Sequence, residues 1–519
     1  MGRTERVQRA RASLAVIGSC LLSVLTAQAQ AQAAGSGTGP AGPAAYNANT
    51  GLSPAAVNQA QQQLSGASGP GGAQVGLQST GSPVSQDSYR GSIVSGTATG
   101  GVIDLPLEDA IQRGLRTNLG IILQSSAEQN ANGQRLEQLQ SLLPTVSGGA
   151  SISVQQLNLA AFGLTFPGLN PIVGPFQVTD FRAYLSQTLF NLPSLQNYLA
   201  AKHNFASAKF TAQDARDLVV LTVGNAYLLC VADSARVEAV KAEMATSKLS
   251  LDQAVASHEA GTSPRIDVLR AQVDYQNEQQ SLISTTNQLE KDKLALARTI
   301  GLPLDQQFRL TDSVPYAALD GIDPRTAFAE ALKNRKDLQA LNETVKAAEA
   351  EKKAAWQQQL PQADVSGNYG DQGDTVGHSH GTYSVNGEIT APILQIAKTR
   401  GDEQVAGSQY EQAKARYLDQ IQQVNADIRD SILDIEAAAK LVDATKSNAA
   451  LAAEALSEAQ QRFHAGVSDN LPVSQAQTQT EQANDQYISA LYQHNVAKLS
   501  LARALGVAQT SYKDYLGGK

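Results

Sequence analysis

Four segments of the chain alternate between apolar and polar residues with a period of two. They cover residues 145–154, 181–189, 363–369 and 383–391. In a β-strand this period places the apolar side chains on one face and the polar side chains on the other. About ten such residues are typical of a strand in a membrane β-barrel, which faces lipid on one side and water on the other. A soluble hairpin with one buried face has the same pattern, so alternation alone leaves both structures open.

Each pair of alternating segments leads into a long segment without proline, residues 194–260 and 400–465. With a rise of about 1.5 Å per residue, a helix of about 65 residues is roughly 100 Å long. In the second of these segments apolar residues recur every seven positions, which predicts a coiled-coil seam. These residues are Ile421, Ile428, Ile435 and Val442, with Val424 between the first two.

The two halves of this pattern form an internal repeat. Leu143-Pro144 recurs 217 positions later as Leu360-Pro361, and Ala260-Gly261 recurs 205 positions later as Ala465-Gly466. The first copy is therefore longer by the difference, 12 residues, between Pro144 and Ala260, and we expect these residues in the apolar loop 159–174. The repeat predicts a duplicated unit of a helix, two strands, a very long helix and a further long helix.

The start of the chain has the pattern of an export signal. Several arginines precede an apolar run from Ser13 to Leu25, and small residues suited to cleavage follow before residue 34. Cys20 is a candidate lipid-attachment site, although apolar residues continue beyond it. The next segment is rich in Gly, Pro, Ala and Gln and predicts a flexible tail. We therefore expect a signal peptide over 1–33, the tail over 34–101, a first repeat over 102–301 with a hairpin at about 145–190, a linker over 302–322, a second repeat over 323–508 with a hairpin at about 362–393, and a C-terminal tail over 509–519.

Composition narrows the function. The net charge is −8 and no long basic run occurs, which argues against a nucleic-acid partner. No nucleotide-binding loop and no Ser/His/Asp arrangement is found, so we expect neither an enzyme nor a cofactor. After the N-terminal run no apolar segment reaches the length of a membrane helix, so a membrane location must rest on strands. Five of the ten phenylalanines fall between Phe162 and Phe190, and the single tryptophan, Trp356, precedes a strand, as suits a membrane interface.

Four strands per chain set a limit on the oligomer. Four strands cannot close a barrel, and open strand edges are not tolerated in lipid. Two chains would give about eight strands, a barrel filled by its own side chains, whereas three would give about twelve and leave room for a lumen. A membrane conduit built from this chain therefore predicts a homotrimer.

Several short motifs occur in the same order in both halves. Leu105-x-Leu107-Glu108-Asp109-Ala110 and Leu142-Leu143-Pro144 are followed by His258 to Gln272 and by Leu296-Ala297-Arg298-Thr299-Ile300-Gly301. This order resembles the TolC-type outer-membrane efflux protein family, the outer membrane factors, over about residues 102–508. The resemblance implies a trimer with a twelve-stranded barrel in the outer membrane and a twelve-helix coiled-coil tunnel in the periplasm. It also implies a periplasmic adaptor and an inner-membrane pump or type I secretion exporter as partners, contact with outer-membrane lipid, and passive conduction without catalysis.

The resemblance also assigns roles to the two turns between the long helices. Ala260, Gly261 and Thr262 in the first copy match the entrance and adaptor contact, as do Ala465, Gly466 and Val467 in the second copy. The glycines also end helices, and the alternative to an added docking role is that they do only this. Some family members carry acidic rings at the entrance, and this chain has Pro472 and Gln475 at the matching positions. A basic residue that takes part in the gate of family members is matched here by Ser468. Only Asp469 lies close, so we expect an entrance without a strong acidic ring.

Three weaker features complete the picture. His378 and His380 lie near Asp371 and Asp374, which fits either a metal site or an exposed polar loop. Cys230 lies in an apolar stretch and is expected to be a small core residue. The rival hypothesis is a secreted or periplasmic coiled-coil scaffolding protein. It would explain the helices and the repeat, but not the four alternating segments arranged as two hairpins.

Overall fold

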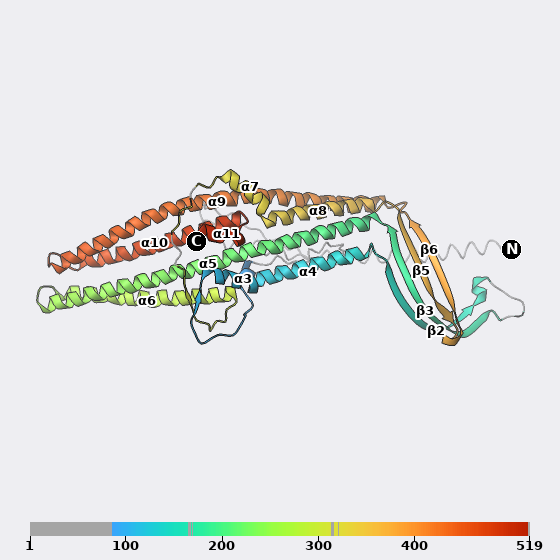
Figure 1. Cartoon of the computed structure of the whole chain (residues 1–519), viewed down its shortest axis with the longest axis horizontal. Helices are drawn as coiled ribbons and strands as arrows, with labels where there is room; N and C mark the ends of the chain where they lie inside the picture. The colour runs from blue at the N-terminus through green and yellow to red at the C-terminus, as the bar shows by residue number, and fades with distance from the viewer. Residues whose placement is uncertain (1–85, 164–167, 169, 313–315, 320, 517–519) are drawn as a thin grey trace, which may run out of the picture. The chain divides into compact units, whose positions relative to one another are not determined.

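The computed structural model describes residues 86–163, 168, 170–312, 316–319 and 321–516. The predicted signal peptide, Cys20 and the first part of the predicted tail lie outside these residues. In the described chain, two repeats follow one another with the same element order (Figure 1). The first consists of α3 (Leu107–Thr117), α4 (Leu119–Gln140), β2 (Thr145–Asn158), β3 (Ile172–Phe190), α5 (Leu192–Glu259) and α6 (Arg265–Ile300). The second consists of α7 (Pro324–Asn334), α8 (Lys336–Gln357), β5 (Gln362–Gly373), β6 (Ser379–Thr390), α9 (Ile396–His464) and α10 (Leu471–Ala504). The internal duplication is confirmed.

The four long strands form one antiparallel sheet in the order β2-β3-β5-β6. The first repeat therefore supplies β2 and β3, the second supplies β5 and β6, and the two repeats join where β3 pairs with β5. Pairing of β2 with β3 continues to Asn158 and Ile172, whereas pairing of β3 with β5 stops at Thr179. The hairpin of the first repeat is thus the longer one, and the edges β2 and β6 have no partner strand within the described chain.

The connections from strand to long helix also differ between the repeats. Only Asn191 separates β3 from α5, whereas residues 391–395 separate β6 from α9. The second repeat therefore has a longer connection and a long helix with one more residue, and both reduce the length difference that the longer first hairpin causes. The surplus of the first repeat therefore lies in its hairpin, and only part of it is in the expected loop, because β2 and β3 are also longer than β5 and β6.

The helices pack in two sets along α5 and α9. On the side of the sheet, α5 packs against α4 and α8, and α8 packs against α9. On the other side, α5 packs against α6 and α10, and α10 packs against α9. The packing orders are therefore α4-α5-α8-α9 and α6-α5-α10-α9, and within the described chain α4, α6 and α9 each have an open side.

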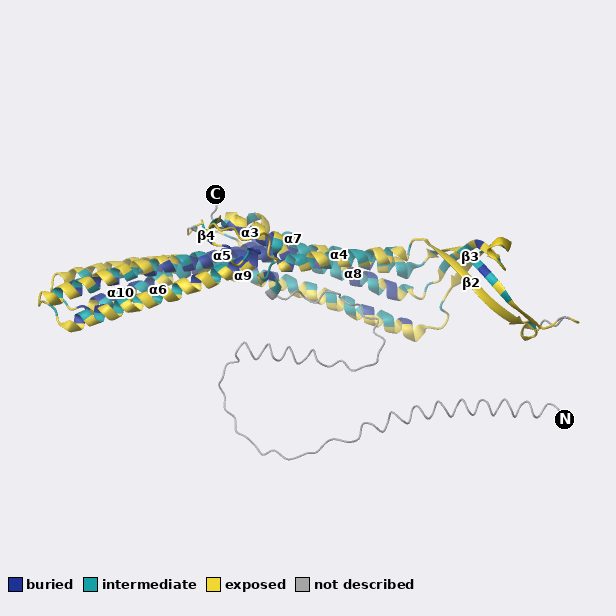
Figure 2. Ribbon diagram, turned by 90° about the horizontal axis from the view of Figure 1, so that it is seen from below, coloured by how far each residue is buried: buried dark blue, intermediate teal, exposed yellow. Residues whose placement is uncertain are grey.

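The predicted seam of α9 is confirmed by burial. Val424, Ile428, Ile435 and Val442 are all buried. The first three belong to one apolar cluster, against which Ile421 packs. The cluster also contains Leu501 and Ala497 of α10 and Ala331 of α7. The seven-residue period therefore marks the face on which α9 contacts the neighbouring helices (Figure 2).

A second core forms where α3, α5, α6 and α10 meet. Its centre is the apolar part of α5, including Val219, Val223, Leu228 and Cys230, all of them buried. By length and composition this part of α5 could cross a membrane, which corrects the expectation that no such segment exists. Half of it is buried against other helices, so packing explains its hydropathy. Burial raises the pKa of the Cys230 thiol to about 12, as befits the expected core residue.

Residues 86–101 differ from the flexible tail that composition predicts. Tyr89 is buried against Gly120, where a Cβ atom would lie 2.4 Å from the tyrosine ring. Asn118 Nδ2 donates a hydrogen bond of 2.6 Å to the carbonyl of Tyr89. Ser95 N donates one of 2.9 Å to the carbonyl of Gly301. These contacts fix residues 86–101, hereafter the strap, to α3, α4 and the end of α6, so the tail prediction is wrong for this part.

Two further segments outside the predicted repeats are ordered. In the predicted linker, β4 (Phe308–Leu310) pairs in parallel with β1 (Ile103–Leu105). In the predicted C-terminal tail, α11 (Ala508–Leu516) buries Tyr512 and Leu516 in the core around α5. Both segments therefore belong to the packed structure.

Candidate functional site

The sheet has one apolar face and one polar face. The register aligns the even-numbered residues of β3, β5 and β6 with the odd-numbered residues of β2, and these form the polar face. The remaining positions carry most of the apolar side chains and form the apolar face. The alternation predicted from the sequence thus continues across all four strands.

The apolar face is open in the single chain. Val146 of β2 is 71% exposed, and Ile389 of β6 is 79% exposed. Val154, Tyr369, Tyr383 and Val385 are similarly open. A soluble hairpin would bury these side chains against a core. Within the described chain nothing covers them, and an exposed apolar face of this kind suits a lipid environment.

Aromatic side chains lie at the helix-side end of the sheet. Trp356, in the last turn of α8, is half exposed, and so is Phe190 at the end of β3. Aromatic residues at the ends of strands are typical of a membrane–water interface. Their position agrees with the interface role expected for them from the sequence.

The polar face is held together by charge-assisted hydrogen bonds. Arg182 of β3 donates from Nε to Asp180 at 2.6 Å, from Nη1 to Asn368 at 2.8 Å, and from Nη2 to Gln372 at 3.0 Å. The guanidinium group thereby links β3 to β5. Gly370 faces Arg182 in the register, and a Cβ atom there would lie 2.5 Å from Arg182 Cγ. Because Gly370 has no side chain, the Arg182 side chain has room to extend from β3 over β5.

The predicted entrance residues lie at the two turns between the long helices. Gly261 and Gly466 have φ angles of 73° and 67°, in the left-handed region that favours glycine. Thr262 closes the first turn, because its backbone N–H and its hydroxyl each donate to the Ser257 carbonyl at 2.9 Å. The six predicted contact residues, Ala260 to Thr262 and Ala465 to Val467, are all exposed. They are therefore accessible at the ends of the helical hairpins (Figure 1).

A small apolar cluster joins the two hairpins behind these turns. Ala254 of α5, Ala271 of α6, Phe463 of α9 and Val473 of α10 pack together. Next to this cluster, Pro472, Gln475 and Asp469 are exposed, whereas the Ser468 hydroxyl oxygen is buried. The residues matched to the gate thus lie on one short segment at the start of α10, and Asp469 is the single carboxylate among them.

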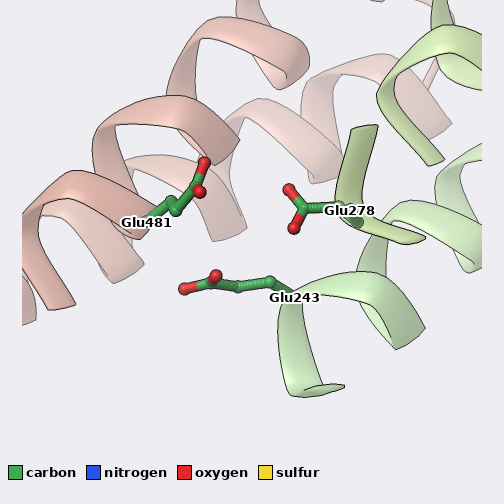
Figure 3. Close-up of side chains that lie close together, drawn as sticks. All are labelled: Glu243, Glu278 and Glu481. Carbon is green, nitrogen blue, oxygen red and sulfur yellow. The ribbon is translucent and has the colours of Figure 1, made fainter. Parts of the chain in front are cut away.

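A group of three glutamates between the hairpins was not predicted from the sequence. Glu243 of α5, Glu278 of α6 and Glu481 of α10 point toward one another (Figure 3), with one carboxylate oxygen from each within 4.8 Å of the others. Asn484 Nδ2 donates a hydrogen bond of 2.9 Å to Glu243. Burial, with repulsion from Glu481, Glu243 and Asp274, raises the pKa of Glu278 to about 7. No sequence spacing reveals this group, because its members come from three helices.

The histidine pair does not gather further ligands in the described chain. His378 Nδ1 lies 3.7 Å from a carboxylate oxygen of Asp374, and both side chains are exposed. His380 lies on β6, opposite Gln372. Among the described residues, the glutamates are the group of three or more ligand-type side chains close enough to share an ion. This geometry favours the exposed polar loop.

Comparison with known proteins agrees with this architecture. The model of a family described as outer membrane efflux protein matches residues 122–302 and 327–507, one match in each repeat. The solvent efflux pump outer membrane protein SrpC of Pseudomonas putida is 24% identical over 374 residues, which are 70% of this chain and 77% of that protein. The antibiotic efflux pump outer membrane protein ArpC, also of Pseudomonas putida, is 22% identical over 427 residues, which are 78% of this chain and 83% of that protein.

Solved structures show the same fold. The outer membrane protein VceC of Vibrio cholerae superposes with a TM-score of 0.68 at 18% identity, covering 77% of this chain and 96% of VceC. The open state of the MtrE outer membrane channel of Neisseria gonorrhoeae gives a TM-score of 0.68 at 18% identity, covering 80% of this chain and 94% of MtrE.

Proposed function

Because the chain belongs to the outer membrane efflux protein family, it is an outer-membrane channel component of an efflux system, and we propose that three copies close into one continuous conduit. Twelve strands form a barrel in the outer membrane, and the helices form a tunnel in the periplasm. A periplasmic adaptor and an inner-membrane pump deliver the substrate to this tunnel. A type I secretion exporter would use the same conduit.

The open sheet with an exposed apolar face is the observation that carries this proposal. Among the described residues, the outer edges of β2 and β6 have no partner strand, so backbone groups at both edges of the sheet are unpaired. Unpaired backbone groups cost several kcal/mol each in hydrocarbon, so β6 of one copy must pair with β2 of the next. Three copies give about twelve strands and a lumen lined by the polar face, whereas two would give a filled barrel.

The open sides of the helices support the same closure. On α6, exposed apolar residues fall at the two apolar positions of a heptad: Ile266, Leu269, Val273, Ile283 and Leu294. On α9, Leu433, Leu441 and Leu451 are exposed, with the exposed small residues Ala437 and Ala444 between them and Ala455 one turn beyond. Heptad seams of this kind pair with another helix. Because α6 and α9 are at opposite ends of the packing order, each seam fits the other helix of a neighbouring copy.

The conduit works passively, and the pump supplies the energy. The names of related proteins refer to solvent, toluene, pyoverdine and antibiotic export. A polar lumen that is lined by uncharged side chains and a few charged ones suits passage of varied solutes, and we propose small organic compounds as the substrate class.

Mass measurement and conductance test this proposal together. The purified protein is analysed in mild detergent by light scattering and is then inserted into planar bilayers. We expect the mass of a trimer and discrete conductance steps. A stable monomer or dimer, or a trimer that never conducts, would show that the proposal is wrong.

A further inference from the structure

The connection from β6 to α9 is the most exposed apolar segment among the described residues. Ile393 is 92% exposed and Leu394 is 86% exposed, and Ile396 in the first turn of α9 is 61% exposed. No charged residue occurs between Glu388 and Lys398. Large aliphatic side chains that stand side by side in this way are unfavourable in water, so the segment needs an apolar environment.

The corresponding junction of the first repeat is shorter and its apolar side chains are less exposed, with Leu189 at 66% and Leu195 at 40%. There, Asn191 alone separates strand from helix, and its side chain caps α5 by accepting from Ser194 N at 2.9 Å. The second repeat has five residues at this place, and no side chain caps α9. Because both connections join the same sheet to the same set of helices, the difference is a feature of the second repeat and not a requirement of the fold.

The segment continues the apolar face of the sheet. Val385 and Ile389 of β6 are open on that face, and Ile393 follows four residues after Ile389. The first charges after the apolar segment are Lys398 and Arg400. Arg400 lies four residues after Ile396 and therefore on the same side of α9. An apolar group followed by cations about one helical turn away is typical of a segment at the membrane surface, where basic side chains reach the lipid phosphates.

We propose that residues 391–396 form an interfacial anchor that inserts Ile393, Leu394 and Ile396 into the periplasmic leaflet of the outer membrane. Lys398 and Arg400 then face the phosphate groups of the same leaflet. The anchor fixes the depth of the barrel in the bilayer at the point where strands give way to helices. This inference rests on the proposed function, because it requires that the apolar face contacts lipid.

Tryptophan fluorescence tests the anchor, because Trp356 is the single tryptophan of the chain. In a Trp356→Phe background, Ile393→Trp and Leu394→Trp are made separately. If one of these variants fails to assemble, the other still tests the anchor. Val385→Trp on the apolar face is the lipid-exposed control, and Val467→Trp at the entrance turn is the water-exposed control. Each full-length protein is reconstituted into vesicles of phosphatidylcholine that carries bromine either near the headgroup end or near the methyl end of its acyl chains.

We expect Ile393→Trp and Leu394→Trp to emit at shorter wavelength than Val467→Trp and to lose most fluorescence with bromine near the headgroups. Val385→Trp should be quenched by bromine deeper in the bilayer. If Val385→Trp is quenched but both anchor variants are not, the anchor is refuted and the proposed function stands. Quenching of the anchor variants by acrylamide would then place the segment in water, and protection from both quenchers would place it against a neighbouring copy. If Val385→Trp is also unquenched, the proposed lipid contact of the sheet fails.

Discussion

At the scale of single residues, the ionised form of Glu278 destabilises the folded protein. Its carboxylate lies between two helical hairpins beside Glu243 and Glu481, and its buried Oε2 atom has no hydrogen-bond partner among the described residues. The pKa rises from 4.5 to about 7, first because of burial and then because of the neighbouring carboxylates. The folded protein therefore binds this proton more tightly than the unfolded chain does, and ionisation destabilises the fold.

Glu278→Gln should therefore stabilise the protein above neutral pH. The penalty is absent below the unfolded pKa of 4.5 and fully present above the folded pKa of about 7. It is at most about 3 kcal/mol, and less if water screens the group. Thermal unfolding of purified wild type and variant should show a higher midpoint for the variant near about pH 8, and the difference should shrink toward about pH 4.5.

Glu290→Gln is the matched control for this prediction. Glu290 lies on the same helix, α6, but is exposed and pairs with Lys293 at 2.9 Å. Its replacement should change the midpoint little at any pH, because exposed ion pairs contribute little. A pH-independent difference for Glu278→Gln would mean that packing, and not ionisation, sets the midpoint.

The sequence predicts residues whose role is local and misses those whose role depends on distant partners. Gly261 and Gly466 are predictable as helix ends, because a glycine followed by a proline marks a turn wherever it lies in the fold. The close approach of Arg182 to Gly370 and the meeting of three glutamates depend on strand register and helix packing. No spacing along the chain contains that information.

At the scale of elements, strands and long helices follow from periodicity, whereas the strap does not. The alternating segments and the proline-free segments each span enough residues for a period to be recognised. The strap is rich in Ser, Thr and Gly and has no period, so its composition predicts disorder. It is fixed by single contacts, such as Tyr89 on Gly120 and Thr99 N donating to Gln306 at 2.7 Å.

A double-mutant cycle should reveal how the strap is held. Tyr89→Ala removes a buried ring and should cost about 3 kcal/mol. Gly120→Ala should also destabilise the protein, because its Cβ atom would meet the ring at 2.4 Å. In the Tyr89→Ala background the clash is gone, and Gly120→Ala should be neutral or slightly stabilising, since alanine is the better helix former and Gly120 lies in the first turn of α4.

Denaturant unfolding of the four proteins measures this cycle. The free energies of unfolding should show strong coupling between the two positions. Additive effects would mean that the strap does not rest on Gly120 in solution. We expect deletion of residues 35–85 to leave the trimer intact, because their composition cannot support a core of their own.

At the scale of the whole molecule, the open sides of α6 and α9 should meet between copies. Val273 lies near the start of α6 and Ala455 near the end of α9, at similar distances from the entrance turns. The double variant Val273→Cys, Ala455→Cys, treated with a short bis-maleimide, should give covalent dimers and trimers on denaturing gels. Each single variant should remain monomeric on the same gels, because Cys230 is buried. A double variant that stays monomeric would contradict the proposed closure of the helices.

In the assembled channel, the response of the entrance to divalent ions depends on which side chains line it. If the tunnel closes at its periplasmic end, the turns at Gly261 and Gly466 lie near the threefold axis, with Ser468, Pro472 and Gln475 around it. Carboxylates are the groups that bind divalent cations, and these three residues supply none. We therefore expect the conductance of the wild type in planar bilayers to be nearly insensitive to millimolar divalent ions.

Gln475→Asp should give the entrance this sensitivity. Gln475 is exposed at the start of α10, and one carboxylate per copy places a charge of roughly −3 in a narrow ring, whose field attracts cations. Divalent ions should then block the variant at concentrations that leave the wild type open, and Gln475→Asn, which adds no charge, should behave as the wild type does. Strong block of the wild type would point to Asp469 as the ring instead. An unchanged Gln475→Asp variant would mean that this side chain does not face the lumen, and the closed end would then be formed by other residues of α10.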